Sequence, residues 1–242
     1  MNRVKFSCLK SLISQGIPEG ENILISGTPG TGKSALAMQF INEGAAAGEN
    51  GLYVTLDGGV ESVLDEAEGF GIDFRKLISK KKIDVVRIDP KDIYAFLDDL
   101  EKHIKRVNAK RLVIDSISIL AVYAASYRNL PEDLIAFLQE TEHEPPIVLS
   151  ENIKKQMIYT ILSKIQKMGC TSLMISELSR DAKWYSRDTI SEFACGGIIL
   201  LEYHVLGAAG VSRTISIIKM RKTKHAEGVH EFKLTDKGFG LS

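Results

Sequence analysis

Short apolar runs alternate with amphipathic stretches along most of the chain. The runs have the length and composition of buried strands, and they predict strands over Asn22–Ser26, Gly51–Leu56, Asp84–Ile88, Arg111–Asp115, Thr171–Ser176, Gly197–Glu202, Thr214–Lys219 and Val229–Leu234. Between the runs, Ala35–Ile41 has the pattern of a helix. Ile93–Val107 places apolar residues at 93, 96, 97, 100, 104 and 107, which is helical spacing. The alternation predicts an α/β fold with a mainly parallel sheet covered by helices on both faces.

The helical pattern stops after Gly197. Three predicted strands follow with only turns between them, so we expect antiparallel strands to complete the sheet at its C-terminal edge. A chain of 242 residues with 44% hydrophobic content is long enough for one substantial core. No linker or repeat divides it, and residues 1–242 are therefore expected to form a single domain.

Composition excludes several classes of protein. The sequence has no apolar run near the ~18 residues that span a bilayer and no signal-peptide pattern, so we expect a cytoplasmic protein with no membrane partner. The 31 basic and 31 acidic residues argue against a surface built for tight nonspecific binding of nucleic acid. Cys8, Cys170 and Cys195 lack zinc-site spacing and are interpreted as small buried apolar residues.

One segment between a predicted strand and a predicted helix carries specific chemistry. It matches the phosphate-loop pattern G-x-x-x-x-G-K-[ST] and consists of Gly27, Thr28, Pro29, Gly30, Thr31, Gly32, Lys33 and Ser34. Glycines allow backbone N–H groups to approach phosphate oxygens, and the helix that follows directs its positive dipole end at them. Lys33 reaches the β- and γ-phosphates in such loops, and the Ser34 hydroxyl is a Mg²⁺ ligand. The segment predicts binding of a nucleoside triphosphate.

A second candidate metal ligand ends the predicted strand Arg111–Asp115. A carboxylate at the carboxyl end of a strand meets the Mg²⁺ shell in phosphate-loop enzymes. We therefore assign Asp115 to that shell together with Ser34, and the alternative is an aspartate that caps a turn.

Four stretches together resemble the KaiC/RadA branch of the RecA-like ATPases, and more closely the single-domain archaeal KaiC-like proteins. They are Gly16-Ile17-Pro18, Leu52-Tyr53-Val54-Thr55-Leu56, Leu112-Val113-Ile114-Asp115-Ser116 and Lys219-Met220-Arg221-Lys222-Thr223-Lys224-His225. The last is the most discriminating, because many unrelated NTPases share the phosphate loop alone. The resemblance implies a RecA-like core, ATP and Mg²⁺ as ligands, and a homo-oligomeric ring, typically a hexamer, with ATP between subunits.

The resemblance also implies that Lys219, Arg221 and His225 reach the phosphates bound by the adjacent subunit. A physical reason supports this role. Lys219 and Arg221 are two residues apart, so on a strand both side chains project from one face, where two cations can neutralise charge on a γ-phosphate. The alternative is a solvated basic edge strand that discourages aggregation.

The sequence departs from the family where a pair of glutamates usually activates the attacking water. Asp57-Gly58 stands there instead, and Asp57 is shorter by one methylene. Because a general base must lie within hydrogen-bond reach of its water, we expect Asp57 to act as a weak base and hydrolysis to be slow. Glu61 is a possible substitute, or simply a solvated residue at a helix start. Ser176-Glu177 is a candidate sensor of the γ-phosphate.

Two segments are candidates for protein-specific roles. Residues 127–152 are longer than the corresponding family connection and resemble an inserted helix and loop. Residues 179–187 combine cations with Trp184, the single tryptophan, and suit contact with single-stranded nucleic acid, a mobile loop or a subunit contact. The function expected overall is a weak ATPase acting as a nucleotide-controlled oligomeric switch. The alternatives are a DNA-binding recombination accessory ATPase of RadA-paralogue type and a nucleotide-binding scaffold without turnover.

Overall fold

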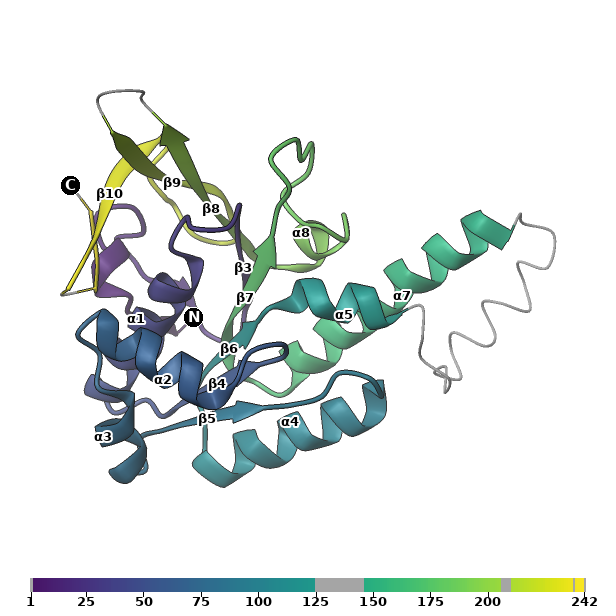
Figure 1. The fold of residues 1–242 in the computed structure, drawn as a ribbon, viewed down its shortest axis with the longest axis horizontal. Helices are drawn as coiled ribbons and strands as arrows, with labels where there is room; N and C mark the ends of the chain where they lie inside the picture. Colours follow the sequence, from purple (N-terminus) through teal and green to yellow (C-terminus); the bar gives the residue numbers. More distant parts are fainter. Residues whose placement is uncertain (1, 125–145, 206–209, 237, 242) are drawn as a thin grey trace.

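A twisted sheet of strands forms the centre of the molecule (Figure 1). The computed structural model describes residues 2–124, 146–205, 210–236 and 238–241. Among these, nine strands make one sheet: β3 (Asn22–Gly27), β4 (Gly51–Thr55), β5 (Ile83–Arg87), β6 (Arg111–Asp115), β7 (Thr171–Glu177), β8 (Gly197–Val205), β9 (Val211–Met220), β10 (His230–Thr235) and β11 (Gly238–Leu241). Their spatial order is β11-β10-β9-β8-β3-β7-β6-β4-β5. The six strands from β8 to β5 run parallel, and β9, β10 and β11 are antiparallel additions.

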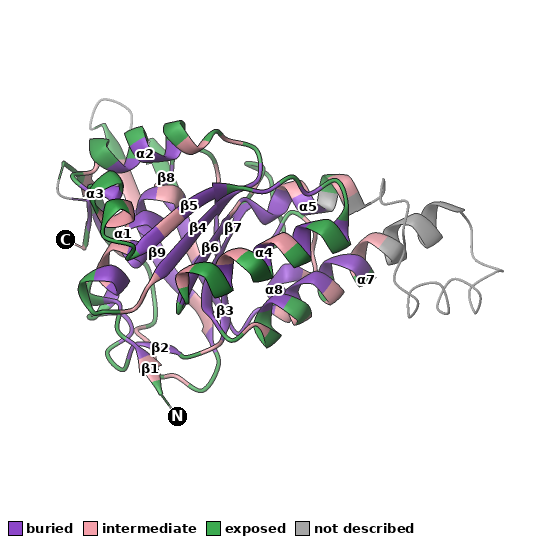
Figure 2. Ribbon diagram, turned by 90° about the horizontal axis from the view of Figure 1, so that it is seen from below, coloured by how far each residue is buried: buried purple, intermediate pink, exposed green. Residues whose placement is uncertain are grey.

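Helices cover both faces of this sheet (Figure 2). The first face packs against α1 (Lys33–Ala46), α2 (Val60–Gly69) and α3 (Phe74–Ser79), and the second against α4 (Ile93–Val107), α5 (Ile117–Ala124) and α7 (Pro146–Lys167). Strand periodicity divides the core: Ile23 and Ile25 point to the first face and Leu24 to the second. The short elements are β1 (Arg3–Val4), η1 (Ser7–Leu9), β2 (Ile17–Pro18) and α8 (Ser191–Ala194).

The α/β sheet predicted from the sequence is confirmed, with one correction to its C-terminal part. β8 pairs in parallel with β3, so it belongs to the parallel layer, and the antiparallel additions begin only at β9. The reason is that residues 178–196, which include α8, carry the chain back along the sheet before β8 starts. The apolar pattern did not predict β11, which has only four residues, two of them glycine.

The predicted insert 127–152 lies largely outside the described residues. Within them, the backbone is helical from Pro146 onward in α7. None of the helices that the structure describes is both long enough and apolar enough to cross a bilayer.

Local signals set the bounds of α4, whose predicted range Ile93–Val107 is confirmed. The Asp92 carboxylate accepts hydrogen bonds from the N–H groups of Tyr94 and Ala95, at 2.9 and 3.0 Å, and thereby caps the first turn. Asn108, at φ 50°, ends the helix in the left-handed conformation. The amphipathic stripe between these caps packs on the second face of the sheet.

The cysteines largely follow expectation. Cys170 and Cys195 are buried, whereas Cys8 is only half-buried. Burial raises the pKa of the Cys170 thiol to about 11, and the nearby Lys110 charge opposes that shift only in part. Such thiols stay protonated near neutral pH and behave as apolar side chains.

A buried arginine joins the amino-terminal segment to the core. The Arg111 side chain is 1% exposed, and its Nε donates to the Glu49 carboxylate at 2.7 Å. Its two terminal nitrogens donate to the carbonyl oxygens of Phe40 (2.8 Å) and Lys5 (2.9 Å). The guanidinium carbon also lies 4.6 Å from the centre of the Phe40 ring. One side chain thus connects β6, α1 and the chain start.

We expect Arg111→Ala to lower the free energy of unfolding by about 3–5 kcal/mol, because it leaves buried acceptors and a carboxylate without a partner. Urea denaturation, monitored by circular dichroism, measures this change. Arg106→Ala is the matched control, because Arg106 also pairs with a carboxylate, that of Asp84, but its side chain is 59% exposed. We expect this control to lower the free energy of unfolding by less than about 1 kcal/mol. Equal losses in the two variants would refute the structural role of Arg111.

Candidate phosphate-binding site

The phosphate loop lies where the parallel strands end, between β3 and the first residue of α1. Gly30 and Gly32 have φ angles of 80° and 97°, a left-handed conformation that glycine adopts without strain. A Cβ at Gly27 would lie 2.4 Å from the Leu201 carbonyl oxygen, so β8 packs directly against the start of the loop. The conformation of the loop therefore depends on its glycines.

Lys33 is held inside the loop. Its side chain is buried, and Nζ donates to the Thr28 carbonyl oxygen at 2.9 Å. Burial lowers the pKa of Lys33, while the negative charges of Glu177 and Asp115 act in the opposite direction. The ammonium is therefore directed toward the concave side of the loop, among acidic groups.

Ser34 and Asp115 meet as the sequence predicted. The Ser34 hydroxyl donates to Asp115 Oδ2 at 3.1 Å, and the hydroxyl of Tyr53 donates to the same oxygen at 2.5 Å. Burial raises the pKa of Asp115, and the two hydrogen bonds oppose that shift.

The donor set fits Mg²⁺ bound together with phosphate. Mg²⁺ prefers oxygen ligands, and in nucleotide sites it takes one or two from protein side chains and the rest from phosphate and water. Ser34 and Asp115 supply two adjacent oxygens of this kind. Among the described residues no group of three or more His, Cys, Asp or Glu side chains could hold a metal ion alone. The site therefore fits a metal that arrives with its nucleotide.

The acidic residues near Asp115 differ in their surroundings. Asp57 is exposed just after β4, and its charge contributes to the raised pKa of Asp115. Glu66, on α2, has its pKa raised by desolvation and then by the charge of Asp115. Glu61 is bound at 2.7 Å to Arg75 in an exposed ion pair, as expected for a solvated helix start. Of these acidic residues, Asp57 and Glu66 are the two whose charges interact with that of Asp115.

The two candidate sensor residues separate. Ser176 is buried, and its Oγ accepts a hydrogen bond from the Arg187 N–H at 3.4 Å. Glu177 lies opposite Gly27 in the β3–β7 register, and its negative charge opposes the effect of burial on the pKa of Lys33. Only Glu177 is positioned beside the phosphate loop.

Lys219, Arg221 and His225 lie at the other end of the sheet. Arg221 N–H donates to the Gly196 carbonyl oxygen and Gly196 N–H to that of Asn22, both at 2.8 Å, so Arg221 is level with the start of β3, whereas Lys219 pairs with Ile198, which lies opposite Leu24. The phosphate loop follows the other end of β3, about 17 Å along the strand from the level of Arg221 and about 10 Å from the level of Lys219 at roughly 3.3 Å per residue. The structure thus does not bring these three side chains to the phosphate loop of their own chain.

The three basic residues have partners within the chain. Lys219 Nζ donates to the Glu192 carbonyl oxygen at 2.7 Å, and Arg221 donates to that of Phe193 at 3.2 Å. Nδ1 of His225 lies 3.1 Å from the Ala226 carbonyl oxygen. Desolvation, followed by the charge of Arg221, lowers the pKa of Lys219.

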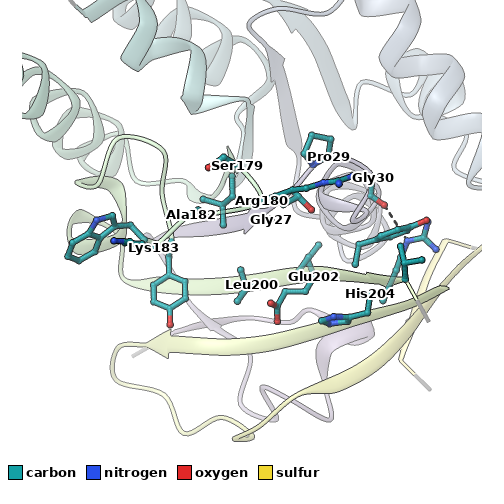
Figure 3. A pocket seen from close by; sticks show the side chains of 18 residues that line it. Gly27, Pro29, Gly30, Ser179, Arg180, Ala182, Lys183, Leu200, Glu202 and His204 are labelled. Atoms are coloured by element: carbon teal, nitrogen blue, oxygen red, sulfur yellow. Dashed lines mark hydrogen bonds between the residues drawn. The ribbon is translucent and has the colours of Figure 1, made fainter. Parts of the chain in front are cut away.

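A cleft of about 1170 Å³ opens beside residues 27–30 of the phosphate loop. Figure 3 shows Arg180 and Lys183, from the loop after β7, and Glu202 and His204, from β8, around it. Trp184, 54% exposed, also lines the cleft. The candidate nucleic-acid segment 179–187 therefore forms one wall of a hollow next to the phosphate loop.

Sequence reasoning missed three residues of the site. They are Tyr53, Glu66 and Arg213, whose Nε donates to the Gly30 carbonyl oxygen at 3.3 Å. Tyr53 could have been found, because strand alternation places it on the α1 face of β4, beside the strand that ends in Asp115. Arg213 and Glu66 approach through tertiary packing, for which the local sequence holds no signal.

Comparison with known proteins gives a consistent result. A family model described as KaiC ATPase matches residues 6–148 and 147–241. The circadian clock oscillator protein KaiC of a Picosynechococcus strain is 26% identical over 237 residues, which are 93% of this chain and 41% of that protein. The chain therefore spans about two fifths of the length of that clock protein.

Archaeal relatives match over most of their length. A UPF0273 protein of Pyrococcus furiosus is 29% identical over 247 residues, which are 95% of this chain and 89% of that protein. The crystal structure of a KaiC-like protein from Pyrococcus horikoshii superposes with a TM-score of 0.80 at 30% identity, covering 100% of this chain and 99% of that one. The resemblance seen in the sequence is confirmed.

We expect Tyr53→Phe to weaken binding of Mg·ATP about tenfold, because a residue that hydrogen-bonds a metal-binding carboxylate typically contributes that much to metal affinity. Binding of ATP in excess EDTA should change much less. Calorimetric titrations under both conditions measure the difference. Tyr159→Phe, at an exposed position on α7, is the control. Equal weakening with and without Mg²⁺ would contradict a role exerted through Asp115.

Proposed function

Because this chain belongs to the KaiC ATPase family, we propose that it binds Mg·ATP in its phosphate loop and hydrolyses it slowly at the contacts between identical subunits. The observation that carries the proposal is the separation of its two basic centres. Lys33 follows the carboxyl end of β3, whereas Arg221 is level with the start of β3 and Lys219 with Leu24 in its first half. One chain alone cannot place both on one triphosphate.

Binding follows from the geometry of the loop. The backbone N–H groups of residues 28 and 30–34 and the start of α1 favour an anion, and Lys33 adds a full positive charge. Ser34 and Asp115 are the side chains that would hold Mg²⁺, which when bound neutralises charge on the phosphates. Tyr53 orients the Asp115 carboxylate for that role.

A head-to-tail arrangement of subunits supplies the missing cations. If the β9 end of one subunit faces the phosphate loop of the next, Lys219, Arg221 and His225 meet phosphates that they cannot reach in their own chain. Such a heterologous contact closes into a ring when its rotation permits, and the family resemblance favours a hexamer. Phe193, 61% exposed beside Arg221, adds an apolar residue to this face.

The same arrangement suits a switch better than a fast enzyme. Asp57 is the carboxylate that we propose as general base, but it is short and solvated, and Gly58 beside it has no side chain. Weak base catalysis lengthens the lifetime of bound ATP. Subunits joined through that ATP would change their contacts only when it is hydrolysed, which couples nucleotide state to assembly or partner binding. In the limit of no turnover the protein would be a nucleotide-binding scaffold.

The cleft beside the phosphate loop favours a second candidate function, contact with single-stranded nucleic acid in a recombination accessory role. Arg180, Lys183 and Arg213 supply positive charge, and Trp184 offers an exposed ring on which a base can stack. Glu202 and the neighbouring Asp181 reduce the net charge, so the expected affinity is modest.

We expect the variants Arg221→Ala and Lys33→Ala each to lose most phosphate release and an equimolar mixture to recover it in part. If subunits mix at random, about a quarter of the contacts pair an intact phosphate loop with intact cations. A malachite-green assay measures release, and light scattering must show mixed assemblies. No recovery in proven mixed assemblies would exclude catalysis shared between subunits.

For the second candidate we expect single-stranded DNA to bind with an affinity that falls steeply as salt rises. Trp184→Ala should weaken binding by about 1–3 kcal/mol, and Trp184→Phe, which keeps a stacking ring, should weaken it less. Arg187→Ala should also reduce affinity. Fluorescence anisotropy measures all four proteins. Absence of binding at low salt would eliminate the nucleic-acid function.

A further inference from the structure

We infer that Glu192 is a positioning residue that fixes Lys219 and Arg221 for the neighbouring subunit's phosphates and ties them to the phosphate loop of their own chain. This inference rests on the proposed function, because it assumes that the two cations act across a subunit contact. It adds a residue that neither the sequence motifs nor the phosphate loop contains. Glu192 lies on α8, where its carboxylate binds the loop after β7 and its carbonyl oxygen binds Lys219.

The Glu192 carboxylate anchors the loop that follows β7. Its side chain is buried, and Oε2 accepts hydrogen bonds from the N–H groups of Tyr185 (2.6 Å) and Ser186 (3.0 Å). A carboxylate that accepts two backbone N–H groups makes charge-assisted bonds, which are stronger than neutral ones. The position of residues 185 and 186 is therefore fixed relative to α8.

The same loop is bound to the end of β3. The Ser26 hydroxyl donates to the Tyr185 carbonyl oxygen, and Leu178 N–H donates to the Gly27 carbonyl oxygen at 3.0 Å. Ser26 and Gly27 immediately precede Thr28, whose carbonyl oxygen holds Lys33. A change in the phosphate loop therefore acts directly on the strand end to which residue 185 is bound.

On its other side α8 holds both cations through its backbone. Lys219 donates to the carbonyl oxygen of Glu192 itself, and Arg221 donates to that of Phe193. These are carbonyl groups near the C-terminal end of a helical turn, where cations are favoured. Because the acceptors are backbone atoms, Lys219 and Arg221 move with α8.

The start of α8 is also fixed. The Asp188 carboxylate accepts from the N–H groups of Ile190 (2.8 Å) and Ser191 (2.6 Å). Thr189, between Asp188 and Ile190, has a φ of 60°, which is unusual for a β-branched residue. The contacts of Asp188 and Glu192 hold this conformation in place. The position of α8 is therefore fixed relative to the loop after β7 and to Lys219 and Arg221.

These contacts form one continuous connection from the phosphate loop, through residue 185 and Glu192, to Lys219 and Arg221. In an assembly it joins each nucleotide site to the next one. Loss of the Glu192 carboxylate should leave binding of ATP nearly unchanged and misplace the cations, and a misplacement of about 1 Å is enough to slow a reaction by about a hundredfold.

The test uses the full chain carrying Glu192→Ala, with Glu227→Ala, at an exposed position, as the control. We expect Glu192→Ala to lower the turnover number about tenfold or more while affinity for Mg·ATP stays within about threefold. Dilution into an excess of Lys33→Ala subunits should then restore turnover per Glu192→Ala subunit, because each intact phosphate loop now faces intact, correctly placed cations. A residue that only stabilises its own chain would show no such rescue.

The outcomes separate the inference from the proposed function. Rescue of Arg221→Ala by Lys33→Ala subunits, without rescue of Glu192→Ala, overturns the inference alone. Rescue of neither variant overturns the shared site and the inference with it. Wild-type turnover in Glu192→Ala also overturns the inference. If Glu192→Ala does not assemble, Glu192→Asp, too short by one methylene to reach both N–H groups, is tested by the same dilution and judged by the same results.

Discussion

The cage of backbone N–H groups at the carboxyl end of β3 is the feature on which the rest of the structure depends. It requires left-handed glycines at 30 and 32, a close approach of β8 to Gly27, and a helix that starts at Lys33. Each of these conditions is met by a neighbouring element of the sheet. The parallel layer also delivers Asp115 and Glu177 to the same edge, because parallel strands end together.

The sheet also places its two groups of basic residues toward opposite ends of the parallel strands. Antiparallel β9 runs back along β8 and leaves Arg221 level with the start of β3 and Lys219 level with Leu24, both away from the phosphate loop. In the function proposed above, each of these two groups of residues is one half of a site that is completed between subunits. Association of subunits through opposite ends of their sheets is the simplest arrangement that would complete such a site. Within each chain, α8 and the loop before it connect the two groups of residues.

Much of this architecture could be predicted from the sequence. The apolar runs predicted most of the strands, and the apolar spacing of Ile93–Val107 predicted the bounds of α4. The parallel direction of β8 could not be predicted, because strand direction depends on the path of residues 178–196 and not on the composition of the strand. For the same reason Glu192 was overlooked. A single glutamate in a four-residue helix has no local pattern, and its role follows from tertiary contacts with Tyr185, Ser186 and Lys219.

The most direct test of the central claim is a calorimetric titration of Mg·ATP into the folded chain. The account predicts a saturable heat of binding with one nucleotide per chain, which is lost when Lys33→Ala removes the ammonium from the loop. Absence of any heat with every magnesium-bound nucleoside triphosphate, on protein shown to be folded by circular dichroism, would contradict it.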